Sequence, residues 1–155
     1  MIDLYSDTTT RPSRAMREAM LHAEVGDEQR REDPTTLRLE ERVAGLLGKE
    51  AAVFLPSGAM CNQIAFAVHC RAGDEIIMDR TAHPLNYEAG GPSALVGAVI
   101  RPLDGNRGVF TAGQVEEAIR PAGYEMPRTR VVSIEQTTNI RGGICWTMAA
   151  ISAVA

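Results

Sequence analysis

Hydrophobic positions along the chain follow two patterns, a helical spacing and short continuous runs. Met16, Met20 and Ala23 recur at intervals of four and three residues, which predicts an amphipathic helix over about 13–24. Asp33 before Pro34 is typical of a helix start, and Gly48 of a helix end. Further helices are predicted after Gly58 with Cys61, Ile64, Ala65 and Val68 on the inner face, near 93–96, from Thr111 through Ile119, and over 148–155.

Four short apolar runs predict strands, and helices separate them. The runs are 51–55, 75–78, 98–100 and 130–134. Continuous apolar runs are typical of buried parallel strands, and the alternation implies βαβ units. We therefore expect an α/β fold with three layers, a mainly parallel sheet flanked by helices. The chain stops within the apolar, Ala-rich segment 148–155 without a helix stop signal, so we expect this architecture to be incomplete.

The segment Leu55-Pro56-Ser57-Gly58-Ala59-Met60 joins the first predicted strand to a helix. Free amides at a helix N-terminus, together with a serine hydroxyl, form an anion site, and Gly58 lets the backbone approach a phosphate closely. The carboxyl ends of parallel strands are also where ligands of open α/β sheets bind. The alternative is a tight turn with a capping serine. No dinucleotide or P-loop glycine motif is present.

His83 follows the predicted strand 75–78 and precedes Pro84. A residue before proline favours an extended backbone, so His83 is predicted to be extended and to present its ring over a ligand at the neighbouring turn. The alternative is a structural or solvated histidine.

Other polar residues are weaker candidates. The cluster 5–10 around Ser6 offers hydroxyls and a carboxylate to a small polar substrate, although a serine turn ahead of a helix explains it equally. Glu88, Glu135 and Asn139 lie near predicted strand or loop ends.

Composition and charge exclude several classes of function. The formal net charge is −4 and no Lys/Arg run is present, which disfavours a nucleic-acid partner. No apolar run approaches the roughly 20 residues of a membrane helix, and the N-terminus lacks the features of a signal peptide. The three cysteines show no C-x-x-C spacing, which argues against a zinc site or a disulfide framework and favours a reducing cytoplasm. We expect no metal.

An ordered set of short motifs resembles the low-specificity L-threonine aldolases, which are pyridoxal-phosphate (PLP) enzymes of fold type I. The resemblance covers essentially the whole chain. Its motifs are Ser6-Asp7-Thr8, Glu24-Val25-Gly26-Asp27, Glu32-Asp33-Pro34-Thr35, Leu39-Glu40, Leu47-Gly48-Lys49-Glu50-Ala51-Ala52, Pro56-Ser57-Gly58, Ala82-His83, Tyr87-Glu88, Pro127-Arg128-Thr129-Arg130 and Gly142-Gly143.

The resemblance implies retro-aldol cleavage of L-threonine or L-allo-threonine to glycine and acetaldehyde, with PLP as cofactor. It also implies that residues 1–155 form the N-terminal part of the PLP-dependent large domain, with 1–30 as a helical arm and the C-terminal remainder absent. Relatives are homo-oligomers, so we expect a dimer or tetramer of the complete enzyme. The predicted partner is a small amino-acid substrate.

The resemblance assigns roles to individual residues. The cofactor phosphate would lie at Ser57, Gly58 and Ala59. His83 resembles the histidine that stacks on the pyridine ring, and Glu88 lies near that ring in relatives. Ser6 resembles a residue that helps to bind the substrate carboxylate.

Three positions depart from the common family pattern. Ala59 replaces a threonine, and the lost phosphate hydrogen bond would weaken PLP binding by about 1–2 kcal/mol. Arg30 stands where many relatives carry a tyrosine. Thr138 stands where many carry a histidine that is a candidate base, so that role is not carried over.

The lysine that holds PLP in relatives lies further along than this chain reaches. Lys49 is the sole lysine. It precedes the predicted strand 51–55, which spans about 17–20 Å, so we expect it at the opposite end of the sheet from Ser57. We therefore expect this chain to be inactive by itself. Two alternatives stay open, a non-catalytic remnant that binds phosphate or a partner subunit, and a PLP enzyme that catalyses β-elimination or racemisation.

Overall fold

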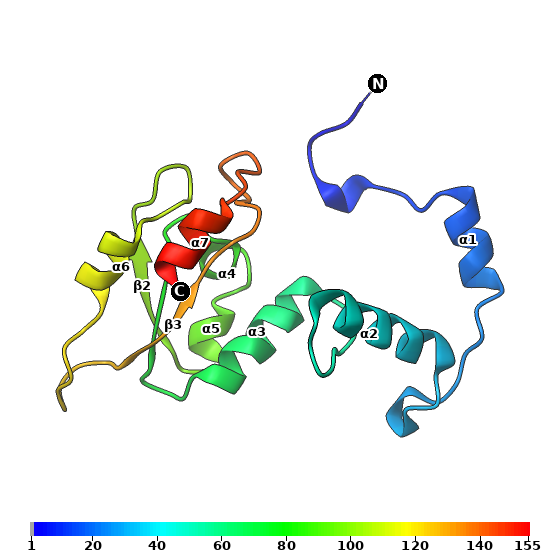
Figure 1. Ribbon diagram of the computed structural model, residues 1–155, viewed down its shortest axis with the longest axis horizontal. Helices are drawn as coiled ribbons and strands as arrows, with labels where there is room; N and C mark the ends of the chain where they lie inside the picture. Colours follow the sequence, from blue (N-terminus) through cyan, green and yellow to red (C-terminus); the bar gives the residue numbers. More distant parts are fainter. Residues whose placement is uncertain (1) are drawn as a thin grey trace. The chain divides into compact units, whose positions relative to one another are not determined.

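The computed structural model describes residues 2–155. The chain divides into two compact units, one running up to Phe54 and the other covering Leu55–Ala155 (Figure 1). The assignment of the whole chain to one large domain, with 1–30 as an arm, stays a prediction.

The first unit is helical, and its capping residues determine where the helices begin and end. Its elements are η1 (Asp7–Thr9), α1 (Arg14–Leu21), η2 (Glu28–Arg30) and α2 (Pro34–Leu47). Asp33 caps α2, with its Oδ1 accepting from the Thr36 amide at 2.7 Å, and Gly48 ends the helix at φ 60°. Both ends of α2 agree with the sequence prediction. Helix α1 ends at Leu21, three residues earlier than predicted.

The second unit is built on a parallel sheet of three strands. These are β1 (Glu75–Asp79), β2 (Val99–Leu103) and β3 (Thr129–Ser133), in the order β2-β1-β3. Strand β1 is central and buried along its whole length. Ile76 pairs with Ile100 on one side and with Val131 on the other.

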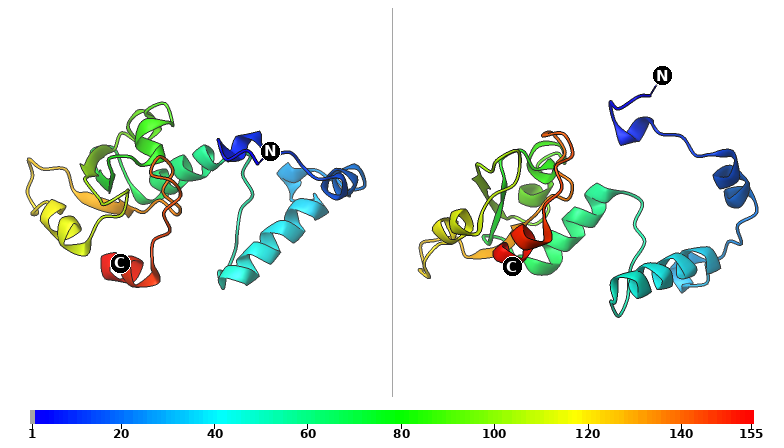
Figure 2. Two further views of the ribbon diagram at one scale, coloured as in Figure 1. Left: turned by 90° about the horizontal axis from the view of Figure 1, so that it is seen from above. Right: turned by 45° about the horizontal axis from the view of Figure 1, so that its top comes forward.

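Helices cover both faces of this sheet, as Figures 1 and 2 show. The helices are α3 (Gly58–His69), α4 (His83–Asn86), α5 (Gly91–Ala94), α6 (Ala112–Ala118) and α7 (Met148–Val154). Because successive side chains of a strand point to opposite faces, Ile76 and Met78 pack with Phe66 of α3, whereas Ile77 packs with Val115 of α6. The predicted three-layer α/β architecture is confirmed.

The prediction of a buried strand over 51–55 is wrong. Val53 and Phe54 are 67% and 54% exposed, and no strand among the described residues pairs with this segment. The Phe54 amide instead donates to Glu40 Oε1 of α2 at 2.9 Å. A strand exists only where a neighbouring strand accepts its backbone hydrogen bonds, and apolar composition alone does not provide that neighbour.

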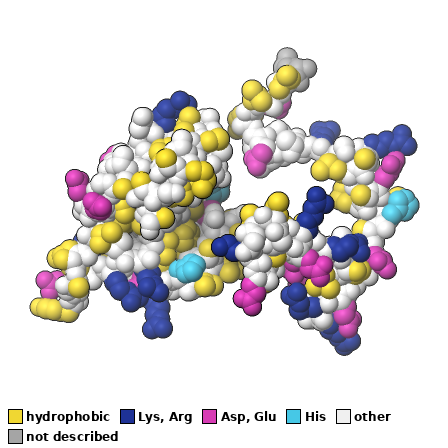
Figure 3. Space-filling view, viewed as in Figure 1, with side chains coloured by type: hydrophobic (Ala, Val, Ile, Leu, Met, Phe, Trp, Pro, Cys, Tyr) yellow, Lys and Arg dark blue, Asp and Glu magenta, His cyan; other side chains and the backbone are white. Residues whose placement is uncertain are grey.

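The predicted inner face of α3 is also wrong. Cys61, Ile64, Ala65 and Val68 are exposed, and the helix buries Phe66 against the sheet instead. Asn62 and Gln63 share that half-buried side of α3 because they contact Glu88. Hydrophobic side chains reach the surface in both units (Figure 3), so apolar character does not identify the packed face in this chain.

Two charge pairs lie where β1 begins. Glu75 is fully buried and accepts from Arg120 Nε at 2.7 Å and from the Thr129 hydroxyl at 2.9 Å. The neighbouring Asp74 accepts from Arg128 at 3.0 Å and from the Arg71 amide at 2.8 Å. A buried charge is tolerated where it is paired and hydrogen-bonded, and here the pairs join the start of β1 to the segment that precedes β3.

Candidate active site

The N-terminus of α3 offers unpaired backbone amides to an anion. Ser57 is the N-cap, with its Oγ accepting from the Met60 amide at 3.2 Å and its carbonyl from the Cys61 amide at 3.1 Å. Among the described residues, the amides of Gly58 and Ala59 have no acceptor. A methyl group placed on Gly58 would meet nothing within 4 Å, so the turn is open. Such a turn is an anion site by geometry and by the helix dipole.

The sequence predicted that this turn follows a sheet strand, but 51–55 is not a strand. The prediction that Lys49 lies at the opposite end of the sheet loses its basis for the same reason. Lys49 belongs to the first unit, whereas the α3 turn belongs to the second.

His83 lies beyond the carboxyl end of β1, as predicted, but its backbone is not extended. It is the first residue of α4, and Pro84 is the second. Proline is tolerated in the first turn of a helix because its missing amide would have no acceptor there. The His83 amide is held at 2.8 Å by Oε1 of Glu135, a residue from the segment after β3.

The imidazole of His83 is fixed by the carboxylate of Glu88. His83 Nδ1 lies 2.9 Å from Glu88 Oε1. The side chain of Glu88 is 1% exposed and that of His83 is 42% exposed. An ionised Glu88 carboxylate only accepts hydrogen bonds, and with that state Nδ1 is the donor and Nε2 is left for another partner.

Two amide side chains of α3 hold the Glu88 carboxylate from the other side. Asn62 Nδ2 donates to Oε1 at 2.7 Å, and Gln63 Nε2 donates to Oε2 at 2.6 Å. Asn62 lies five residues after Ser57, about 7 Å along the helix axis. Helix α3 therefore provides both the anion site and the support for the His83–Glu88 pair.

His83, Glu88 and Glu135 were candidates from the sequence, and hydrogen bonds join the three. Asn62 and Gln63 were not predicted, because nothing in the sequence shows that their amides bind the buried Glu88 carboxylate. Tyr87 packs its ring beside that of His83, with centroids 5.6 Å apart and planes at 39°.

Ser6 is not brought into this cluster by any contact of the described residues. It belongs to the first unit and caps η1, with its Oγ accepting from the Thr8 amide at 3.2 Å. Thr138 is buried at 1% exposure, and its Oγ1 accepts from the Ile144 amide at 3.0 Å.

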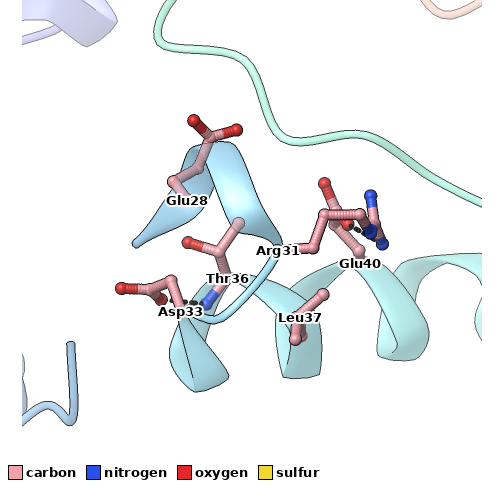
Figure 4. Close-up of a pocket in the computed structure, with 6 residues that line it drawn as sticks. All are labelled: Glu28, Arg31, Asp33, Thr36, Leu37 and Glu40. Atoms are coloured by element: carbon pink, nitrogen blue, oxygen red, sulfur yellow. Dashed lines mark hydrogen bonds and ion pairs between the residues drawn. The ribbon is translucent and has the colours of Figure 1, made fainter. Parts of the chain in front are cut away.

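Figure 4 shows a small hollow of the first unit, lined by Glu28, Arg31, Asp33, Thr36, Leu37 and Glu40. Its volume of about 20 Å³ holds about one water molecule. Arg31 pairs with Glu40 at 3.2 Å, and the Asp33 carboxylate accepts from the Thr36 amide at 2.7 Å. These contacts make the hollow a structural feature of the α2 start.

Among residues 2–155, no group of three or more His, Cys, Asp or Glu residues is placed to hold a metal ion. Within the same residues, no helix has both the length and the apolar character needed to cross a membrane.

Similarity to a known protein family shows which family the chain belongs to. The family model described as Beta-eliminating lyase matches residues 3–155. The chain belongs to the beta-eliminating lyase family. This membership agrees with the resemblance that the sequence motifs indicated, which the relatives below confirm.

The chain is similar over most of its length to several known proteins. It is 44% identical over 140 residues to a low specificity L-threonine aldolase of Escherichia coli (strain K12), and 45% identical over 148 residues to the low-specificity L-threonine aldolase 1 of Arabidopsis thaliana. These matches cover 90% and 93% of the chain but 42% and 41% of the relatives. It is also 36% identical over 138 residues to alanine racemase TOXG of Cochliobolus carbonum, covering 87% of the chain and 36% of that protein.

The fold of the chain matches a solved structure. A threonine aldolase from Leishmania major superposes with a TM-score of 0.69 at 22% identity, over 79% of this chain and 36% of that one. The three-strand parallel sheet with helices on both faces is therefore part of a threonine aldolase fold.

Proposed function

We propose that this chain supplies the phosphate turn and the ring-stacking histidine of a PLP-dependent, threonine aldolase-like lyase. The reaction is retro-aldol cleavage of L-threonine or L-allo-threonine to glycine and acetaldehyde. The observation that carries the proposal is that α3 has open amides at Gly58 and Ala59 and also anchors, through Asn62 and Gln63, the Glu88 carboxylate that fixes His83.

The chemistry of the α3 turn suits the phosphate of PLP. The amides of Gly58 and Ala59 point out of the first turn, and the Ser57 hydroxyl keeps its own hydrogen for a further acceptor. Phosphate is a dianion with several acceptor oxygens, so it pairs with this set of donors without a cationic side chain. Ala59 contributes its amide but no hydroxyl.

His83 would lie against the pyridine ring of the cofactor. Its side chain is 42% exposed, which leaves a ring face for a ligand, and Glu88 prevents the ring from rotating. A fixed ring plane orients the substrate bond that breaks relative to the π system. When bound, PLP supplies the electron sink that accepts the electrons of that bond.

We propose further that Ser6 helps to bind the substrate carboxylate and that the chain by itself does not complete the reaction. Lys49 is the sole lysine and belongs to the first unit, whereas the phosphate turn and His83 belong to the second. Assembly into homo-oligomers and a cytoplasmic location also stay predictions.

A second candidate reaction keeps the cofactor and changes the bond that breaks. The match to alanine racemase TOXG supports racemisation of a small amino acid, and the description of the family supports β-elimination. All three reactions use the same phosphate turn and stacked ring, and they differ in the products formed.

A binding measurement tests the cofactor proposal directly. We expect PLP to bind the chain at least tenfold more tightly than pyridoxal, which lacks the phosphate. Ser57→Ala should reduce the ratio of the PLP affinity to the pyridoxal affinity. Ser13→Ala is the matched control, because Ser13 caps α1 through the same 3.2 Å bond to the amide three residues on. Equal affinities for PLP and pyridoxal would contradict the proposal.

Product analysis separates the reactions. With PLP present, the chain alone is expected to release no glycine or acetaldehyde from L-threonine. A longer protein that carries this sequence and a cofactor lysine is expected to release both. Pyruvate from L-serine, or D-alanine from L-alanine, in place of glycine would favour elimination or racemisation instead.

A further inference from the structure

We infer that Glu135 is a positioning residue for His83, holding its backbone while Glu88 holds its ring. The inference rests on the proposed function only for its consequence on cofactor binding. The contact itself is a property of the chain without ligand.

Glu135 bridges two segments with its two oxygens. Its Oε1 accepts from the His83 amide at 2.8 Å, and its Oε2 accepts from the Asn139 amide at 2.8 Å. The carboxylate therefore joins the start of α4 to the loop after β3, across 52 residues of sequence in the first contact and four in the second.

The bond to His83 replaces a cap that α4 lacks. Ala82 is the N-cap of α4 and its side chain provides no hydrogen bond. Pro84 has no amide, and the amides of Leu85 and Asn86 both donate to the Ala82 carbonyl, at 3.2 and 3.3 Å. The His83 amide is therefore the amide of this short helix that needs an outside acceptor, and Glu135 is that acceptor.

Helix α4 is too short to hold His83 by its own hydrogen bonds. It has four residues, and a helix of that length is not stable without contacts from elsewhere. The imidazole is thus placed by two carboxylates from two directions, Glu135 at the backbone and Glu88 at Nδ1. Removing the Glu135 carboxylate leaves the Glu88 contact in place. The imidazole then remains bound at Nδ1, but α4 is free to tilt.

The fold brings the two residues together through the sheet. Strands β1 and β3 are parallel neighbours, with Met78 paired to Ser133. Their carboxyl ends therefore lie at one edge of the sheet, and the segments that follow them carry His83 and Glu135.

Glu135→Gln tests this role. The two amides bind different oxygens of Glu135, and glutamine replaces one of these oxygens by an NH2 group, which only donates, so the two contacts are not both kept. We expect the His83 amide to exchange hydrogen at least tenfold faster, and the imidazole signals of His83 to shift or broaden in NMR spectra, while those of His22 and His69 stay unchanged. Glu116→Gln, an exposed position on α6, is the matched control and should alter neither readout.

Glu135→Asp provides the second variant, because it keeps the carboxylate and shortens its reach. It should restore part of the amide protection that Glu135→Gln loses. Unchanged His83 imidazole signals in a folded Glu135→Gln would overturn the inference. If Glu135→Gln does not fold, Glu135→Ala at low temperature takes its place. Full protection of the His83 amide together with unchanged imidazole signals in Glu135→Ala would overturn the inference. Equal amide protection in Glu135→Asp and Glu135→Ala would overturn it as well.

Ligand titrations separate this inference from the proposed function. Glu135→Gln should weaken PLP several-fold but leave inorganic phosphate unaffected, because phosphate alone needs only the α3 turn. If PLP does not bind the unmodified chain while the His83 signals still respond to Glu135→Gln, the proposed function fails and the positioning role stands.

Discussion

Glu88 Oε1 accepts a hydrogen bond from His83 Nδ1 at 2.9 Å. The side chain of Glu88 is 1% exposed, whereas the imidazole of His83 is 42% exposed. A buried carboxylate thus orients a half-exposed ring. Asn62 and Gln63 complete the shell, so three donors converge on the two oxygens of Glu88. Each of these donors needs an acceptor, which makes the charge state and shape of Glu88 decisive for the site.

Replacing Glu88 by glutamine should destabilise the second unit. The new amide group would face one of the three donors with a donor of its own, and an unsatisfied buried donor costs about 1–3 kcal/mol. We expect a loss of that size in the free energy of unfolding, measured by urea denaturation, together with mobile His83 imidazole signals in NMR spectra. Glu116→Gln, which is exposed, should leave both unchanged. Equal stability of Glu88→Gln and the parent chain would contradict the burial of this carboxylate.

A methyl group at Gly91 should disturb the hydrogen bond between Gln63 and Glu88. A Cβ at Gly91 would lie 2.6 Å from the side-chain amide carbon of Gln63, which displaces Gln63 from Glu88. Loss of this buried hydrogen bond to the carboxylate costs about 1–3 kcal/mol, so we expect Gly91→Ala to lower the unfolding midpoint in urea. Gly113→Ala is the control, since its Cβ would meet nothing closer than 3.9 Å. It should leave stability unchanged or slightly raised, and a similar loss in both variants would refute the steric argument.

Asp74 should make stability depend on pH in the acid range. The hydrogen bond from the Arg128 guanidinium holds the pKa of Asp74 below its usual 3.8, helped by the Arg71 amide. A lowered folded pKa adds stability that is fully present above pH 3.8 and is lost as pH falls through the folded pKa. Asp74→Asn should therefore be less stable than the parent chain at pH 7, and the difference should shrink below pH 4.

Urea unfolding at several pH values checks this prediction. Asp104→Asn is a useful comparison, because Arg80 also lowers the pKa of Asp104 but the pair is exposed, at 59% and 75%. Exposed pairs are screened and contribute little, so Asp104→Asn should follow the parent curve closely. A stability difference for Asp74→Asn that stays constant from pH 7 to pH 3 would show that the pairing with Arg128 does not matter.

The sequence predicted those elements whose start and end signals are local. Asp33 and Gly48 bound α2 as expected, and the Thr111–Gln114 capping box opens α6. The apolar runs of β1, β2 and β3 identified the three strands of the sheet within a few residues. These features depend on neighbouring residues, which the sequence displays directly.

The errors arose where the outcome depends on distant partners. The run 51–55 has the composition of a strand, but Phe54 donates its amide to the Glu40 side chain and no strand pairs with the segment in the described part of the chain. Likewise, α3 buries Phe66 rather than the stripe that contains Ile64 and Val68. The sequence pattern shows how much apolar surface a helix or strand carries. Which part of that surface is buried depends on the segments that pair with it or pack against it.

The candidate site was predictable in part. His83 and the Ser57–Gly58 turn stood out as single motifs, and parallel neighbours explain why His83 meets Glu135. The support from Asn62 and Gln63 was not foreseen, because amide side chains in a helix show their role only when the buried carboxylate they bind is known.

We propose that the α3 turn and His83 form one PLP site. The most direct measurement is an NMR titration of the chain with PLP that follows the amides of Gly58 and Ala59 together with the imidazole of His83. All three signals should respond along one binding curve, with ring-current shifts at His83, whereas inorganic phosphate should shift the two amide signals alone. Amide shifts that saturate without any change at His83, or a PLP response confined to residues outside this site, would contradict it.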